Sequence, residues 1–114
     1  MVPWYKIKNY NIKIKTIILN NHIYGITKAY QETNFEGRAE ACGPKGYSPP
    51  NFIKIAEAYG AQGIRAQSMN EFEKALKNAL NSDVATVIDV PINPDEDVFP
   101  FVVPNSALKD MVIA

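Results

Sequence analysis

The chain of 114 residues has one cysteine, one histidine and no excess of charge of either sign. Because Cys42 is the only cysteine, the sequence excludes a disulfide framework and a zinc site built from spaced cysteines, and it fits a reducing, cytoplasmic compartment. Twelve basic and twelve acidic side chains cancel, so no strong field attracts nucleic acid or an anionic membrane. No apolar run approaches the length of a membrane span, and Pro3, Lys6 and Lys8 interrupt any signal peptide. The composition predicts a cytoplasmic globular protein without nucleic acid or membrane partners.

Strand and helix patterns alternate along the chain. A β-branched apolar run predicts a strand over 14–20, and its near-continuous apolar character predicts burial on both faces. Apolar residues at helical spacing, with Asn51 and the pair Ser68 and Glu71 as N-terminal caps, predict helices. The predicted elements are a strand over 14–20, a helix over 24–36, a helix after Asn51, a strand over 64–67, a helix after Ser68 and a strand over 84–90. This order is typical of an α/β fold with a parallel sheet and flanking helices.

The length predicts one domain over residues 1–114. Residues 1–13 have no clear period and are expected to be irregular or a frayed helix end, whereas the Gly- and Pro-rich residues 38–50 predict a loop. Prolines recur between 91 and 104, which predicts an extended C-terminal strap over 91–114 with a short helix at 106–112. The apolar residues of this strap predict that it lies over a neighbouring surface; they are Phe99, Phe101, Val102 and Val103.

Two consecutive asparagines, Asn20 and Asn21, follow directly after the first predicted strand. Open α/β sheets bind ligands at the carboxyl ends of their strands, so these side chains mark a candidate site. Asparagine is also common in turns, and a simple turn after a strand is the alternative interpretation. His22 has no acid or nucleophile placed to work with it, so we expect a polar residue at the rim of a site, and we predict no catalytic residue in the chain. Cys42 is expected to be a spectator thiol.

Several stretches, in chain order, resemble thiamine-diphosphate enzymes of the acetolactate synthase (acetohydroxyacid synthase) group. They are Ile17-Ile18-Leu19-Asn20-Asn21 with Tyr24-Gly25-Ile26, Phe35-Glu36-Gly37-Arg38, residues 51–60, Val87-Ile88-Asp89-Val90, and Asp95-Glu96-Asp97-Val98-Phe99-Pro100. The double asparagine is similar to the closing half of the thiamine diphosphate motif of this group. The resemblance covers nearly the whole chain and implies the C-terminal, diphosphate-side part of the cofactor domain, with the fold incomplete.

The resemblance implies thiamine diphosphate and Mg²⁺ as cofactors. By position, the side-chain oxygen of Asn21 and the backbone carbonyl of Ile23 are the implied Mg²⁺ ligands, and oxygen ligands suit this hard cation. Gly25 permits close approach of the backbone to the cofactor, and the amides of the helix that starts there favour the charge of the phosphates. The implied cofactor-binding residues are Asn21, Ile23, Tyr24, Gly25 and Ile26.

The resemblance also implies a partner. The motif of this group opens with Gly-Asp-Gly upstream of the double asparagine, and no such triplet precedes Asn21. The glutamate that acts on the aminopyrimidine of the cofactor belongs to another domain, usually of another subunit. We therefore expect a missing N-terminal portion or a second subunit that supplies both elements, a homo-oligomeric enzyme, and no turnover by the chain alone.

Two departures from the group bear on the substrate. Tyr30 occupies a position where typical acetolactate synthases have a tryptophan that shapes the acceptor pocket, so Tyr30 is a candidate substrate-side residue. The loop around Cys42 looks more like relatives encoded with surface-polysaccharide genes. The resulting hypothesis is that the chain forms the C-terminal part of an enzyme that decarboxylates a pyruvate-like 2-keto acid and joins the product to an acceptor. The alternative hypothesis is a non-catalytic, truncated remnant that acts as a protein-interaction or self-associating α/β module.

Overall fold

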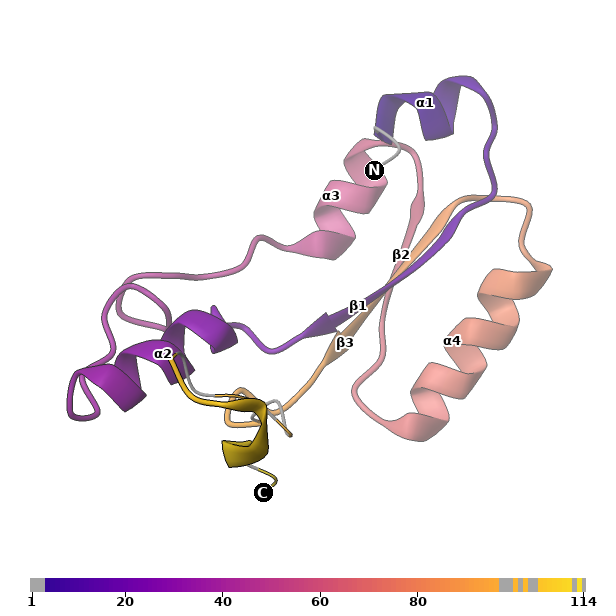
Figure 1. Cartoon of the computed structure of the whole chain (residues 1–114). Coiled ribbons are helices and arrows are strands. Elements are labelled where there is room, and N and C mark those ends of the chain that lie inside the picture. Colours follow the sequence, from indigo (N-terminus) through magenta and orange to yellow (C-terminus); the bar gives the residue numbers. More distant parts are fainter. Residues whose placement is uncertain (1–3, 97–99, 101, 103–104, 112, 114) are drawn as a thin grey trace.

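The computed structural model describes residues 4–96, 100, 102, 105–111 and 113. Helices separate the strands along this part of the chain, as Figure 1 shows. The elements are α1 (Trp4–Asn9), β1 (Lys15–Asn20), α2 (Gly25–Asn34), α3 (Phe52–Ala58), β2 (Gln62–Arg65), α4 (Met69–Asn81), β3 (Thr86–Pro91) and the 3-10 helix η1 (Leu108–Asp110). The predicted α/β fold with a parallel sheet and flanking helices is confirmed.

Short helices lie near both ends of the described part of the chain. α1 lies within the segment that was expected to be irregular or a frayed helix end. η1 occupies the centre of the helix predicted over 106–112, but it is only three residues long. Phe99, Phe101 and Val103 of the predicted strap lie outside the described residues.

β3 is the central strand of a three-stranded sheet with the order β1-β3-β2, and both pairings are parallel. β3 is buried along residues 86–89, which are no more than 1% exposed. The prediction that the strand over 14–20 is buried on both faces is wrong, because Ile17 and Leu19 of β1 are 43% and 66% exposed. The reason is position: β1 is an outer strand, and α4 packs against β3.

Helices cover the two faces of the sheet and bury two apolar clusters. α1 and α3 lie on one face, and α4 lies on the other (Figure 1). Ile88 of β3 is fully buried beneath α4, and burial of such a side chain contributes about 1.5–3 kcal/mol. The clusters consist of Ile7, Ala56, Ala61, Ala85 and Val87 on the first face and Ala66, Ala75, Ala79 and Ile88 on the second.

The helices begin where the sequence predicts their caps. Oδ1 of Asn51 accepts a hydrogen bond from the amide of Lys54 at 3.1 Å, and Oγ of Ser68 accepts one from the amide of Glu71 at 3.3 Å. The carboxylate of Glu71 reaches back to accept a hydrogen bond from the amide of Gln67 at 2.8 Å. An N-cap of this kind is worth about 1 kcal/mol, so both starts are locally specified.

The molecule is elongated. Its radius of gyration is 17.7 Å, whereas a compact domain of this size has a value of about 13 Å. α2 and the C-terminal segment extend beyond one end of the sheet (Figure 1), and α2 has no buried residue. The α2 end of the molecule therefore stands apart from both apolar clusters. Within the described residues, no helix combines the length and the apolar character needed to cross a membrane.

Candidate functional site

A cavity of about 730 Å³ lies between α2, the turn that precedes it and the segment after β3. β1 and β3 both run toward this end of the molecule, so the cavity lies at the carboxyl ends of the strands (Figure 1). Pro94, Glu96 and Val102 line it from the C-terminal segment. The structure brings together every residue that the sequence predicted for cofactor or substrate: Asn21, Ile23, Tyr24, Gly25, Ile26 and Tyr30 all line this cavity.

The turn between β1 and α2 contains two successive Asx turns. Oδ1 of Asn20 accepts a hydrogen bond from the amide of His22 at 3.0 Å, and Oδ1 of Asn21 accepts one from the amide of Ile23 at 3.2 Å. His22 has a φ of 60°, in the left-handed region that histidine tolerates better than most residues. Its side chain is exposed, as expected for a residue at the rim of a site. The double asparagine thus forms a turn, and that turn is part of the cavity wall.

Gly25 begins α2 directly beside Asn21. A Cβ at position 25 would lie 3.1 Å from Nδ2 of Asn21, which is tighter than ordinary van der Waals contact. The N-cap residue of α2, Tyr24, makes no side-chain hydrogen bond to the helix. The first amides of a helix have no intrahelical acceptor, so those at the start of α2 are donors for an anionic group.

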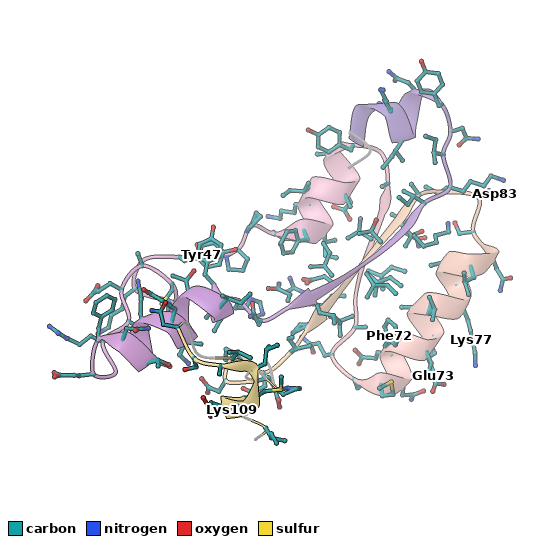
Figure 2. All side chains as sticks on the ribbon, in the orientation of Figure 1. Tyr47, Phe72, Glu73, Lys77, Asp83 and Lys109 are labelled. Atoms are coloured by element: carbon teal, nitrogen blue, oxygen red, sulfur yellow. The ribbon has the colours of Figure 1, made fainter. Side chains whose placement is uncertain are left out.

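The loop around Cys42 packs against the start of α2. The amide of Tyr24 donates a hydrogen bond to the carbonyl of Cys42 at 2.8 Å, and the rings of Tyr24 and Tyr47 have centroids 3.9 Å apart. Figure 2 shows Tyr47 near α2. Cys42 is 2% exposed, and its Sγ lies 3.5 Å from Oε1 of Gln31, so the thiol has little access to solvent. This loop holds Tyr24 at the edge of the cavity.

Tyr30 lies on the cavity side of α2, beyond Ile26. The two side chains are 51% and 82% exposed, and Ala29 and Thr33 line the cavity with them. This apolar face of α2 therefore lines the cavity and is not part of either buried cluster. Tyr30 packs edge-on against Phe35, with ring centroids 6.4 Å apart. The face is available to a ligand, while the substrate-side role of Tyr30 stays a prediction.

An ion pair ties α2 to the segment after β3. Nζ of Lys28 lies 2.7 Å from Oδ1 of Asp95 and 4.0 Å from Oε1 of Glu32. The side chain of Asp95 is 73% exposed, so the pair adds little to stability. The pair connects α2 to the segment that contains Pro94 and Glu96, and this segment forms the second wall of the cavity.

A buried polar network at the same end of the sheet was missed by sequence reasoning. Asp89, in the centre of β3, is 0% exposed. Its Oδ2 accepts hydrogen bonds from Nε and Nη2 of Arg65 at 3.1 Å and 2.9 Å, and its Oδ1 accepts one from Nδ2 of Asn20 at 3.1 Å. The signal that could have revealed it is an aspartate inside the apolar run 84–90, because a buried carboxylate requires partners.

The oxygens of the turn fit a hard cation in part. Oδ1 of Asn21 keeps a second lone pair after it accepts the Ile23 amide, and the carbonyl of Ile23 is a further oxygen. Mg²⁺ is usually bound through one or two carboxylates together with phosphate oxygens. No cluster of three or more His, Cys, Asp or Glu that could hold a metal occurs in the part of the chain that the structure describes. The turn thus offers two neutral oxygen ligands for a cation.

Comparisons with known proteins agree with this geometry. A family model described as "Thiamine pyrophosphate enzyme, C-terminal TPP binding domain" matches residues 4–90. The acetolactate synthase large subunit of Haemophilus influenzae is 30% identical over 106 residues, which cover 92% of this chain and 18% of that protein. The probable acetolactate synthase large subunit of Methanococcus aeolicus is 33% identical over 108 residues, which cover 95% of this chain and 18% of that protein.

A solved structure is also similar. The thiamine diphosphate-dependent 4-hydroxybenzoylformate decarboxylase of Rhodococcus jostii RHA1 aligns with a TM-score of 0.72 and 30% identity over 82% of this chain and 17% of that chain. The chain therefore spans less than a fifth of the length of each of these three relatives.

Proposed function

Because this chain belongs to the family of C-terminal TPP-binding domains of thiamine pyrophosphate enzymes, we propose that it supplies the diphosphate and Mg²⁺ side of a thiamine diphosphate site. The enzyme that it belongs to is acetolactate synthase-like: it decarboxylates a pyruvate-like 2-keto acid and joins the product to an acceptor. The observation that carries this proposal is the turn at Asn21, which faces a cavity together with Gly25 at the start of α2.

Two residues of the turn are the proposed Mg²⁺ ligands. The side-chain oxygen of Asn21 and the carbonyl of Ile23 are hard, neutral donors separated by one residue, and both residues line the cavity. Bound thiamine diphosphate supplies the electron sink for decarboxylation of the keto acid. The part of this chain is to bind and orient the diphosphate end of that cofactor.

The start of α2 is the proposed diphosphate contact. Its first amides have no side-chain cap, and the helix dipole favours negative charge at this end. Gly25 leaves room for a phosphate group to approach the backbone. Tyr24 and Ile26 flank this point in the cavity wall, and Tyr30, further along α2, is the proposed substrate-side contact.

A second polypeptide segment has to complete the site. It would supply a carboxylate ligand within Gly-Asp-Gly and the glutamate that acts on the aminopyrimidine, either from an N-terminal portion or from another subunit of a homo-oligomer. Support comes from the share of the relatives that the chain spans, 18% for the Haemophilus influenzae protein. The elongated shape also supports a partner segment. So do the exposed side chains of Ile17 and Leu19 in β1, since apolar side chains on an outer strand are suited to burial against a neighbour.

Calorimetric titration of the purified chain with thiamine diphosphate tests the proposal. We expect saturable heat that requires Mg²⁺ and that Asn21→Ala abolishes. Asn78→Ala, on the exposed side of α4, is the matched control and should bind as the parent chain does. No binding by a chain with a folded circular-dichroism spectrum would contradict the proposal and favour a non-catalytic module.

A further inference from the structure

Asp89 places a carboxylate in the centre of β3 with 0% exposure. Burial of a carboxylate is strongly unfavourable unless polar or charged partners engage its oxygens. Both oxygens are engaged here: Arg65 of β2 donates two hydrogen bonds to Oδ2, and Asn20 of β1 donates one to Oδ1. The carboxylate therefore connects the centre of β3 to the last residues of β1 and β2.

This network fixes the orientation of the Asn20 side chain. Its Nδ2 is directed to Asp89, so its Oδ1 is directed to the amide of His22, from which it accepts a hydrogen bond at 3.0 Å. Asn20 is only 6% exposed, which limits replacement of these partners by water. A buried amide group with both ends engaged has a single favourable orientation.

The orientation of Asn20 in turn determines the shape of the turn after β1. His22 has a φ of 60°, an uncommon conformation that needs support from its surroundings. The hydrogen bond from its amide to Asn20 provides that support. Asn21 and Ile23 are the neighbours of His22 on either side, so the conformation of His22 sets where their oxygens lie.

We propose that Asp89, with Arg65 as its counter-charge, is a positioning residue for the oxygens of Asn21 and Ile23 and acts through Asn20. The consequence for Mg²⁺ binding rests on the proposed function, whereas the effect on the turn does not depend on it. Contacts of this kind behind a metal ligand matter energetically, and their removal typically lowers metal affinity about 10–100-fold.

Two readouts on the full chain test this proposal. Hydrogen exchange of the His22 amide, followed by NMR, reports on the turn, and titration with thiamine diphosphate and Mg²⁺ reports on the site. The variants are Asn20→Ala, which removes the partner of the His22 amide, and Asp89→Asn, which keeps the shape but not the charge. Arg65→Lys keeps the charge without the double hydrogen bond. Val87→Ala is the control, because it leaves a cavity in the apolar cluster with Ala56 and Ala85 and removes no hydrogen bond of the network.

We expect faster exchange of the His22 amide in Asn20→Ala and Asp89→Asn, and cofactor binding weaker by about tenfold or more. Both changes should exceed those in Val87→Ala when variants with similar losses of Tm are compared. Arg65→Lys should fold, because this side chain is 42% exposed, and should show a smaller effect in the same direction. If Asn20→Ala or Asp89→Asn does not fold, exchange of the His22 amide and cofactor binding in Arg65→Lys test the proposal instead.

Unchanged exchange of the His22 amide in the network variants would overturn the proposal. Equal weakening of cofactor binding in Val87→Ala would also overturn it, because the effect would then follow stability alone. If the parent chain binds no cofactor, the proposed function fails. The exchange of the His22 amide still decides in that case whether the network holds the turn.

Discussion

Gly25 and Asn21 lie so close together that a Cβ on residue 25 would be 3.1 Å from Nδ2 of Asn21. The contact joins the first residue of α2 to the second asparagine of the turn, and both residues line the cavity. The side chain of Asn21 can occupy its position because residue 25 has no side chain. Placement of the proposed Mg²⁺ ligand thus depends on a glycine four residues later.

Gly25→Ala is expected to weaken Mg²⁺-dependent binding of thiamine diphosphate several-fold without lowering Tm. The added methyl group displaces the Asn21 amide, whereas alanine within a helix is favoured over glycine by about 0.5–1 kcal/mol. Calorimetric titration and thermal denaturation of the same samples measure the two effects.

Gly37→Ala is the control for Gly25→Ala. Gly37 has a φ of +78°, and a Cβ on this residue would meet no atom within 4 Å, so the change strains the backbone away from the cavity. It should lower stability by about 1–2 kcal/mol and leave cofactor affinity unchanged. Undiminished affinity in Gly25→Ala would contradict the assigned role of this contact.

Ile88→Ala should destabilise the fold by about 2–5 kcal/mol, because it opens a cavity beneath α4 at a fully buried position. Leu80→Ala removes an apolar side chain of α4 that is 67% exposed, and it should cost less than about 0.5 kcal/mol. Urea unfolding monitored by circular dichroism measures both. Similar losses in the two variants would show that α4 does not pack on the sheet as described.

Lys13 and Asp83 form an ion pair near the turn between α4 and β3, at the end of the molecule remote from Tyr47 (Figure 2). The hydrogen bond from Lys13 and then its charge lower the pKa of Asp83; desolvation opposes this effect, and the charge of Lys15 adds the smallest lowering contribution. A carboxyl with a lowered pKa stabilises the folded state above its unfolded pKa, about 3.9, and loses that effect as the pH falls through its folded pKa.

Asp83→Asn should therefore be slightly less stable than the parent chain near pH 6 and equally stable at strongly acidic pH. The difference is small, because the Asp83 side chain is 86% exposed and solvent screens the pair. Urea unfolding of both proteins across this pH range measures it. A difference in stability that stays constant with pH would mean that the ion pair is not its cause.

The chain alone should not consume pyruvate when supplied with thiamine diphosphate and Mg²⁺. The reason is that the proposed carboxylate ligand and the glutamate for the aminopyrimidine belong to a partner segment. Release of carbon dioxide, measured against a reaction without protein, is a direct assay. Protein-dependent release would show that this chain contains a complete catalytic site.

Much of the fold follows from local patterns in the sequence. The caps at Asn51 and Ser68 are confirmed because each uses an amide three residues further on. The exposure of Ile17 and Leu19 could not be predicted, because it depends on which strand lies beside β1 and on where α4 packs. The sequence pattern of an apolar strand is the same whether or not another strand or helix covers it.

The candidate site also has features that follow from the local sequence and features that depend on distant residues. Asn21 and residues 23–26 come from one stretch of the chain, so their common place at the cavity follows from the position of the turn after β1. The Asp89 network joins residues 69 and 24 positions apart, and no local pattern specifies such pairs. The left-handed conformation of His22 is equally non-local, since it relies on an asparagine that is itself held by β3.

The most direct test of the central claim is paramagnetic broadening by Mn²⁺, which substitutes for Mg²⁺, in the NMR spectrum of the chain with thiamine diphosphate. The account predicts selective broadening of the side-chain amide of Asn21 and the backbone signals of Ile23, with Asn78 unaffected. Broadening that is absent from Asn21 and Ile23, or that does not depend on thiamine diphosphate, would contradict the claim that this turn holds the metal and the diphosphate.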